Sequence, residues 1–137
     1  MNPDADQHYL HVSPIDSQKL YPKNKARDFV VALPLNLNLI GDWEMRLLSV
    51  TLKQKIDRQR IIVCCDLCRE SYCYGEMLPM VKELNFRDFK AGGRCVYSQS
   101  EYYDLHPIST NLVRFTLKGL TQNLPDNIVL SVHLRKK

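Results

Sequence analysis

A chain of 137 residues with 45% hydrophobic and 25% charged residues has the size and composition of one soluble globular domain, and we predict a single domain over residues 1–137. The net charge of +4 is small and spread along the chain, so it permits acidic partners without requiring them. No apolar run approaches the roughly 20 residues of a membrane-spanning helix, and the polar, acidic start MNPDADQHYL is unlike a secretory signal. We therefore predict no membrane insertion and no secretion by signal peptide.

The first part of the chain shows the two-residue period of β-strands. Apolar residues at alternate positions predict a first strand over residues 7–13, and the Pro, Asp, Ser and Asn residues that follow in 14–25 are typical of turns. From residue 28 to 39, apolar side chains occupy every odd position, which is the pattern of a long strand with one buried face. Gly41-Asp42 interrupts the pattern and predicts a turn.

The next predicted strand begins at Trp43, and its apolar pattern changes phase halfway. The apolar positions are odd-numbered up to Leu47 and even-numbered from Leu48 onward. Such a change predicts a β-bulge, or else a strand that is covered on both faces. The connection that follows, residues 53–60, is polar and basic.

The second half of the chain continues with short strands and turn signals. Residues 60–68 are apolar on both faces and predict a central strand, whereas 69–76 read as a loop. Residues 77–89 are ambiguous, because their apolar spacing fits a helix but Pro79 and the β-branched and aromatic residues also fit a strand. The remaining predictions are a strand with a polar break over 94–106, a turn over 107–111, a strand over 112–118, a loop over 119–127 and a last strand over 128–135.

About eight strands separated by turns, with no long amphipathic helix, predict an all-β protein. We expect an eight-stranded antiparallel β-sandwich, and the favoured architecture is a single jelly roll of two four-stranded sheets. An immunoglobulin-like sandwich is the alternative. It is disfavoured because no cysteine pair flanks Trp43 at the expected spacing.

Four of the five cysteines are crowded into one short stretch. An odd number of cysteines without a signal sequence predicts free thiols rather than a disulfide framework. A zinc site usually needs two short-spaced ligand pairs, and the chain has no second CxxC and no histidine near the first. On one strand, Cys64 and Cys68 would share a face opposite Cys65. We therefore predict buried or semi-buried small side chains in the cluster of Cys64, Cys65, Cys68 and Cys73. We predict no metal or cofactor there, and a free thiol at the fifth cysteine, Cys95.

No catalytic pattern stands out either. The chain lacks a GxSxG nucleophile elbow and a glycine-rich phosphate loop, and it has only five glycines. The histidines are dispersed along the chain and predict no site. The carboxylates fall in predicted loops or on strand faces, where they are normally solvated, as at Asp42, Asp66, Glu76, Glu83 and Asp88. We predict that the protein is not an enzyme.

Basic residues and tyrosines suggest two possible contact surfaces. A possible basic patch consists of Lys53, Lys55, Arg58 and Arg60. This segment has no aromatic side chain on which a base could stack, so a nucleic-acid partner is disfavoured and a solvated loop is preferred. Tyrosine is enriched at protein interfaces, which makes four tyrosines possible interface residues: Tyr72, Tyr74, Tyr102 and Tyr103.

A series of short motifs also supports a family resemblance. It begins with Ser17, Leu20-Tyr21-Pro22, Asn24, Phe29, Val31, Leu33-Pro34 and Leu39-x-Gly41-Asp42-Trp43-Glu44. It continues with Val63-x-Cys65-Asp66-Leu67, Pro79, Tyr103-x-Leu105 and Val132-His133-Leu134-Arg135-Lys136. In this order, over nearly the whole chain, the sequence resembles a family of small proteins encoded by Maverick/Polinton elements and by related animal DNA viruses, the adintoviruses and adomaviruses. The GDWE block is the most specific of these motifs.

The resemblance implies a function, because these elements carry genes for virus-like morphogenesis that include jelly-roll capsid proteins. By this resemblance we expect a non-enzymatic structural protein of the virion, a penton-type minor capsid protein or an appendage subunit. Its partners would be copies of itself, as a trimer or pentamer, and other capsid proteins, after synthesis in the host cytoplasm or nucleus. The alternative is a β-sandwich binding module that engages a host protein or carbohydrate through loops such as residues 69–76.

For a structural protein, the expected key residues are those that set the fold. Trp43 should anchor the core between the sheets, and the Gly41-Asp42 turn should place it. Three further residues should fill the core around it: Phe29, Leu33 and Phe115. Tyr21 and Pro22 should pin the first loop and are possible interface residues as well.

Overall fold

The computed structural model describes residues 5–52, 60–85, 93–97, 100–119 and 127–137. Within these ranges the chain is mostly β-strand, with one short 3-10 helix, η1 (Pro14–Ser17), and no α-helix. No helix in the described ranges is long and apolar enough to span a membrane. The strands are β1 (Gln7–Val12), β2 (Asp28–Leu39), β3 (Trp43–Leu52), β4 (Ile61–Cys65), β5 (Ser71–Cys73), β6 (Glu76–Leu78), β7 (Met80–Leu84), β8 (Gly93–Val96), β9 (Tyr103–Asp104), β10 (Ile108–Lys118) and β11 (Val129–Lys136).

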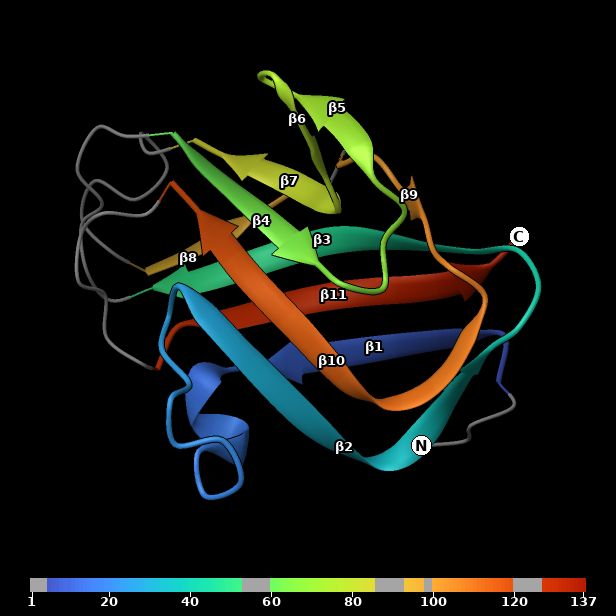
Figure 1. Ribbon diagram of the computed structural model, residues 1–137, viewed down its shortest axis with the longest axis horizontal. Coiled ribbons are helices and arrows are strands. Elements are labelled where there is room, and N and C mark those ends of the chain that lie inside the picture. Colours follow the sequence, from blue (N-terminus) through green and yellow to red (C-terminus); the bar gives the residue numbers. More distant parts are fainter. Residues whose placement is uncertain (1–4, 53–59, 86–92, 98–99, 120–126) are drawn as a thin grey trace.

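Two antiparallel sheets pack face to face (Figure 1). The first sheet has the order β1-β11-β3-β8, with β9 also paired to β3, and the second has the order β2-β10-β4-β7. β5 and β6 form a separate two-stranded hairpin. The predicted all-β antiparallel sandwich is confirmed, and the four strands in the main path of each sheet account for the eight that were expected.

The strand pairing is nested along the chain. β1 pairs with β11, β2 with β10, β3 with β8, and β4 with β7. Each of these pairs is antiparallel, and successive pairs alternate between the first and the second sheet. The chain therefore resembles one long hairpin. Its first arm contains β1 to β4, its second arm contains β7, β8, β10 and β11, and the paired arms wind around a common core.

The core lies between the sheets and is built from alternate residues of the long strands. β10 contributes Val113, Phe115 and Leu117, as the sequence predicts, and β11 contributes apolar side chains at alternate positions from Leu130 to Leu134. Phe115 lies directly opposite Phe29 of β2, and their rings stack with centroids 5.7 Å apart. β4 is buried at all five positions and lies between β10 and β7, which confirms the predicted central strand.

The change of phase in β3 is a β-bulge. Ser131 of β11 pairs with Ser49, but the next residue, Val132, pairs with Leu47. Leu48 is therefore the extra residue of β3, with no residue of β11 opposite it. The extra residue restores the alternation. As a result, Val50 and Leu52 are buried in the same core as Trp43, Met45 and Leu47, although sequence parity alone would place them on the opposite face.

β2 departs from its regular pattern in the middle. Its two ends are buried as expected, but Leu33 is only half-buried and Leu35 is exposed. The pairing with β10 shifts here, since Thr110 pairs with Leu37 whereas Leu112 pairs with Ala32. Pro34 lies in the unpaired stretch, which fits its lack of a backbone N–H.

Three local predictions in the second half were incomplete or wrong. The predicted loop 69–76 contains β5 and the start of β6, which are too short to give an alternating pattern. The ambiguous segment 77–89 contains the end of β6 and all of β7, which pairs along β4, and it contains no helix in its described part. Residues 86–89 lie outside the described residues. The predicted turn 107–111 is mostly strand: β10 begins at Ile108 and pairs with the end of β2, and Asn111 falls at the shift in register. The predicted connections 53–60 and 119–127 also lie largely outside the described residues.

Candidate assembly surfaces

The hairpin of β5 and β6 is closed by a two-residue turn at Tyr74 and Gly75. Both residues have positive φ angles, 49° at Tyr74 and 89° at Gly75. Two consecutive positive φ values are typical of the type I′ turn, whose twist suits a tight hairpin and which favours glycine at its second position. The turn chemistry that indicated a loop in the sequence therefore serves to join two short strands.

The inner side of this hairpin is fixed to the outer face of the second sheet. Cys73 and Leu78 pack on Ile62 and Cys64 of β4 in a small buried cluster that is separate from the main core, and Met80 packs against it. Polar contacts hold the tip, because the Tyr74 hydroxyl donates to Glu83 at 2.7 Å and the Arg60 guanidinium lies 3.7 Å from the Tyr74 ring centroid. The Lys118 ammonium also lies 2.7 Å from a Glu76 carboxylate oxygen. These contacts from β4, β7 and β10 fix the hairpin in one position.

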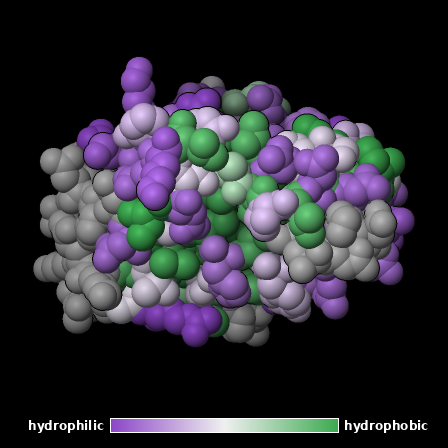
Figure 2. Space-filling view, turned by 90° about the horizontal axis from the view of Figure 1, so that it is seen from below, coloured by the Kyte–Doolittle hydropathy of each residue, from purple (hydrophilic) through white to green (hydrophobic). Residues whose placement is uncertain are grey.

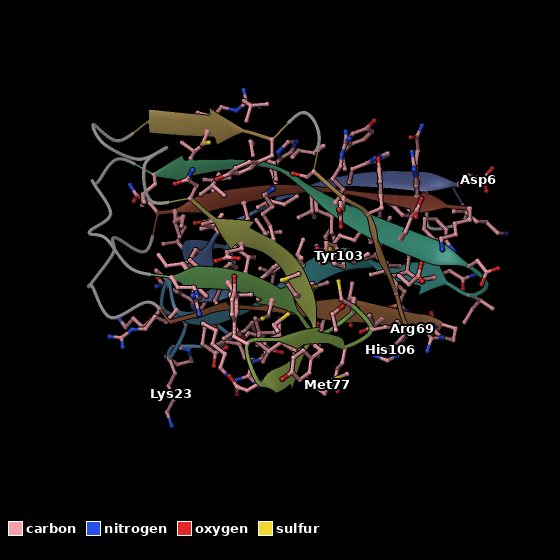
Figure 3. All side chains as sticks on the ribbon, turned by 90° about the horizontal axis from the view of Figure 1, so that it is seen from above. Asp6, Lys23, Arg69, Met77, Tyr103 and His106 are labelled. Atoms are coloured by element: carbon pink, nitrogen blue, oxygen red, sulfur yellow. The ribbon has the colours of Figure 1, made fainter. Side chains whose placement is uncertain are left out.

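The outer side of the hairpin is apolar and exposed. Tyr72 and Met77 are directly opposite each other in the strand pairing, and their exposed fractions are 75% and 56%. Figure 3 places Met77 on the outside of the second sheet, away from the sandwich. We call these two neighbouring side chains the hairpin knob.

A groove lies at the edge of the sandwich that is formed by the edge strands β1 and β2. Its volume is about 280 Å³, and it is lined by Tyr9, Leu10, His11, Val12, Asp16, Val31, Ala32, Leu33 and Pro34. Seen from this edge, hydrophobic residues line a central hollow with hydrophilic residues on either side (Figure 2). We call it the β1–β2 groove. This volume is near the lower end of the range of small-molecule sites, about 300–1,000 Å³.

The outer face of the first sheet carries a polar cluster around His133, which sequence spacing did not predict. The ring is 7% exposed and stacks on Tyr9 with centroids 4.4 Å apart. Gln7 Oε1, 3.0 Å away, can only accept, so Nε2 carries the proton and Nδ1 accepts from the Tyr102 hydroxyl at 2.8 Å. Arg135 lies 3.6 Å from the Tyr102 ring centroid. β1, β11 and the residues before β9 are thereby joined.

We predict that acidification lowers the stability of the protein through His133. Burial lowers the pKa of His133, and the positive charges of Arg46 and Arg135 lower it further. The unfolded chain, with a histidine pKa near about 6.5, then binds a proton more readily than the folded one. The contribution of His133 to the free energy of unfolding is therefore fully present above about pH 6.5, and it is lost as the pH falls from there through the folded pKa.

Thermal melts between about pH 7.5 and about pH 5.5 test this prediction. His133→Gln should show a smaller loss of melting temperature on acidification than the wild type. The same substitution at an exposed histidine of β1, His11→Gln, serves as the control for replacing a histidine elsewhere on this sheet. Burial lowers the pKa of His8 as well, so some dependence should remain in both variants. Equal pH dependence in His133→Gln and the wild type would contradict the prediction.

Three of the predicted fold-setting residues, Gly41, Asp42 and Trp43, lie at the junction of β2 and β3. Trp43 is 3% exposed, its Nε1–H donates to the Ile40 carbonyl at 3.3 Å, and its ring stacks on His8 at 5.6 Å. Gly41 has a φ of +99°, which favours glycine. The Asp42 carbonyl accepts from the Lys137 N–H at 2.8 Å, which ties the turn to the chain end.

The remaining predicted contact residues are not gathered in one place. Tyr102 joins the His133 cluster, Tyr103 is half-buried against the main core, Tyr21 is half-buried and Pro22 is exposed. Of the possible basic patch, Lys53, Lys55 and Arg58 lie outside the described residues. Arg60 contacts the Tyr74 ring and lies 3.7 Å from a Glu83 carboxylate oxygen, so its charge is partly compensated.

The cysteines are divided between two clusters. Cys65 and Cys68 lie in the main core, whereas Cys64 and Cys73 lie under the hairpin. The expectation that Cys64 and Cys68 share a face is wrong, because β4 ends at Cys65 and the chain turns, with the Cys68 N–H donating to the Cys65 carbonyl at 3.0 Å.

Burial holds two of these thiols, Cys64 and Cys65, in their neutral form. Burial, with a smaller contribution from Cys73, raises the pKa of Cys64 to about 11, and burial also raises the pKa of Cys65. The thiolate is the form that binds metals and attacks substrates, so these side chains are poorly prepared for either role at neutral pH. Among the described residues, no three His, Cys, Asp or Glu side chains are grouped so that they could hold a metal ion.

Comparison with family models, with curated proteins and with solved structures gave no match for this chain.

Proposed function

We propose that the sandwich is a single jelly roll and that the chain is a non-enzymatic structural subunit of a virion, a minor capsid or appendage protein. The observation that carries the proposal is the nested strand pairing. The chain is a long hairpin whose successive pairs alternate between a five-stranded and a four-stranded sheet. This is the pairing expected of a jelly roll, the architecture of many viral capsid domains. The resemblance of the GDWE block and its flanking motifs to proteins of Maverick/Polinton elements and related viruses supports the same role.

Two features of the surface support an oligomer rather than a monomer. The hairpin knob exposes an aromatic and a methionine side chain on a support that is already ordered, and aromatic residues and methionine are enriched at protein interfaces. The β1–β2 groove is an apolar hollow between two sheet edges. The proposed partners are copies of this chain, in a closed trimer or pentamer, and other capsid proteins.

Two measurements test the proposed function. Multi-angle light scattering should show a closed oligomer of the purified protein at micromolar concentration, and mass spectrometry should detect the protein in purified particles. A protein that stays monomeric at every concentration and is missing from particles would contradict the proposal.

A second candidate is a binding module for a host protein or carbohydrate, since lectin domains also use the jelly roll. The exposure of Tyr72 and Tyr74 on the hairpin is the observation that favours it. This hypothesis predicts that the purified protein binds host cells as a monomer. It also predicts that Tyr72→Ala weakens this binding without changing the oligomeric state.

A further inference from the structure

We propose that an extended segment of a partner protein adds to the free edge of β1 as a further strand of the first sheet. The observation that carries this inference is a difference between two neighbouring edges. The edge of β1 is open, whereas the edge of β2 is closed by buried side chains of the same chain. The inference goes beyond the proposed virion role, because it concerns the kind of segment that binds at this edge and not the assembly of copies of this chain.

The backbone of β1 has hydrogen-bonding groups on its free side. Within the described part of the chain, β1 pairs only with β11. The Lys136 N–H donates to the Asp6 carbonyl at 2.8 Å, and the register of the two strands continues from there without a shift. In an antiparallel ladder every second residue is hydrogen-bonded to the neighbouring strand, and the residues between direct their N–H and C=O groups to the other side. By this count Tyr9 and His11 face outward and form a template for another strand.

The edge of β2, on the other side of the groove, is closed. The Asn24 side chain takes the place of a neighbouring strand at Val30, because its Oδ1 accepts from the Val30 N–H at 3.0 Å and its Nδ2 donates to the Val30 carbonyl at 2.8 Å. The Ser17 hydroxyl accepts from the Ala32 N–H at 3.0 Å. Both capping side chains are buried. Of these two edges, only that of β1 is left open within the described residues.

The β1–β2 groove supplies the side-chain contacts that an added strand needs. It lies beside the open edge and is lined by Leu10 and Val12 of β1 and by Val31 and Leu33 of β2 (Figure 2). Successive side chains of a strand point to opposite faces of the sheet, so every second side chain of the added strand would enter the groove. Hydrogen bonds to the backbone would then give affinity, and apolar contacts at alternate positions would give specificity.

The backbone groups and the groove together specify the occupant. The outward N–H and C=O groups of β1 require a polypeptide in an extended conformation. A β1 strand of a second copy cannot fill the groove, because its inward side chains, such as Leu10 and Val12, are already buried in its own core. The occupant is therefore a segment that has no sheet of its own, such as an extended tail or loop of another protein, with aliphatic residues at alternate positions.

Peptides selected against the full chain from a phage-displayed library of random linear sequences are the probe. The selected peptide is synthesised with a fluorescent label, and its affinity is measured by fluorescence anisotropy. Tyr9→Pro removes one outward N–H but no hydrogen bond between β1 and β11, a position at which an edge strand accepts proline. It should weaken peptide binding about tenfold or more. Tyr9→Phe is the matched control, because it keeps the N–H and the ring, and it should bind like the wild type.

Two further measurements keep the test independent of the folding of Tyr9→Pro, which circular dichroism checks. Pro34→Glu places a charge at an exposed position of the groove and should also weaken peptide binding. Hydrogen exchange followed by NMR should show that the peptide protects the amides of Tyr9 and His11. The amide of Leu10, which faces β11, should be protected with and without the peptide.

Several outcomes would overturn this inference. One is a selection that yields no binding peptide, and another is a peptide whose affinity is the same for the wild type, Tyr9→Pro and Pro34→Glu. Protection of the Tyr9 and His11 amides by self-association without any peptide would show that a second copy occupies the edge, which also overturns it. None of these results contradicts the proposed virion role. A wild type that stays monomeric and is missing from particles would contradict that role and leave binding at the β1 edge standing.

Discussion

Replacing Trp43 with alanine should lower the free energy of unfolding by about 3–5 kcal/mol, the usual cost of truncating a large buried aromatic residue. The indole is 3% exposed and packs in the main core, so alanine would leave a cavity there. The substitution would also leave the Ile40 carbonyl without its indole donor and His8 without its stacking partner. These losses add to the cost of the cavity.

Urea denaturation followed by circular dichroism is the appropriate measurement, because Trp43 is the only tryptophan and its fluorescence disappears with it. Trp43→Phe keeps most of the buried volume and should cost clearly less. Tyr72→Ala, at an exposed aromatic residue, should change stability by no more than about 0.5 kcal/mol. If Trp43→Ala were as mild as Tyr72→Ala, the indole would not be a core residue.

The architecture could be predicted because the long strands carry regular patterns. Alternation in β2, β10 and β11 reflects one face packed on the core, and the change of phase at Leu48 has a single structural cause, the bulge. Sequence patterns failed where a strand was too short to show a period. β5 and β6 have three residues each, so the Tyr74-Gly75 turn between them could not be distinguished from a loop.

The candidate surfaces were harder to predict than the fold, because they depend on which strands become neighbours. Tyr72 was a possible interface residue from its type alone, but its position opposite Met77 follows from the hairpin register. The His133 cluster joins the first and last strands of the chain, and no local pattern reports such a distant pairing. The β1–β2 groove likewise exists only because both strands lie at sheet edges.

Replacing Gly119 with alanine should be among the most damaging small substitutions in the protein. Gly119 follows β10, and its φ of +88° is one that residues with a side chain rarely adopt. A Cβ atom there would lie 2.2 Å from the backbone carbonyl oxygen of Arg60, the residue before β4. Arg60 directly precedes β4, and its backbone atoms cannot move aside as a flexible side chain can, so β10 and β4 would have to separate at this end of the second sheet.

Gly75→Ala is the matched control, because Gly75 has nearly the same φ, +89°, but nothing within 4 Å of an added Cβ. Both substitutions should carry the cost of a positive φ, about 1–2 kcal/mol, and only Gly119→Ala should add about 1–3 kcal/mol for overpacking. Urea denaturation of the two variants measures this difference, and equal losses would contradict the close approach to Arg60. Ile62 and Cys64 of β4 also pack against the hairpin. A shift of β4 in Gly119→Ala should therefore move the hairpin knob and weaken the proposed assembly.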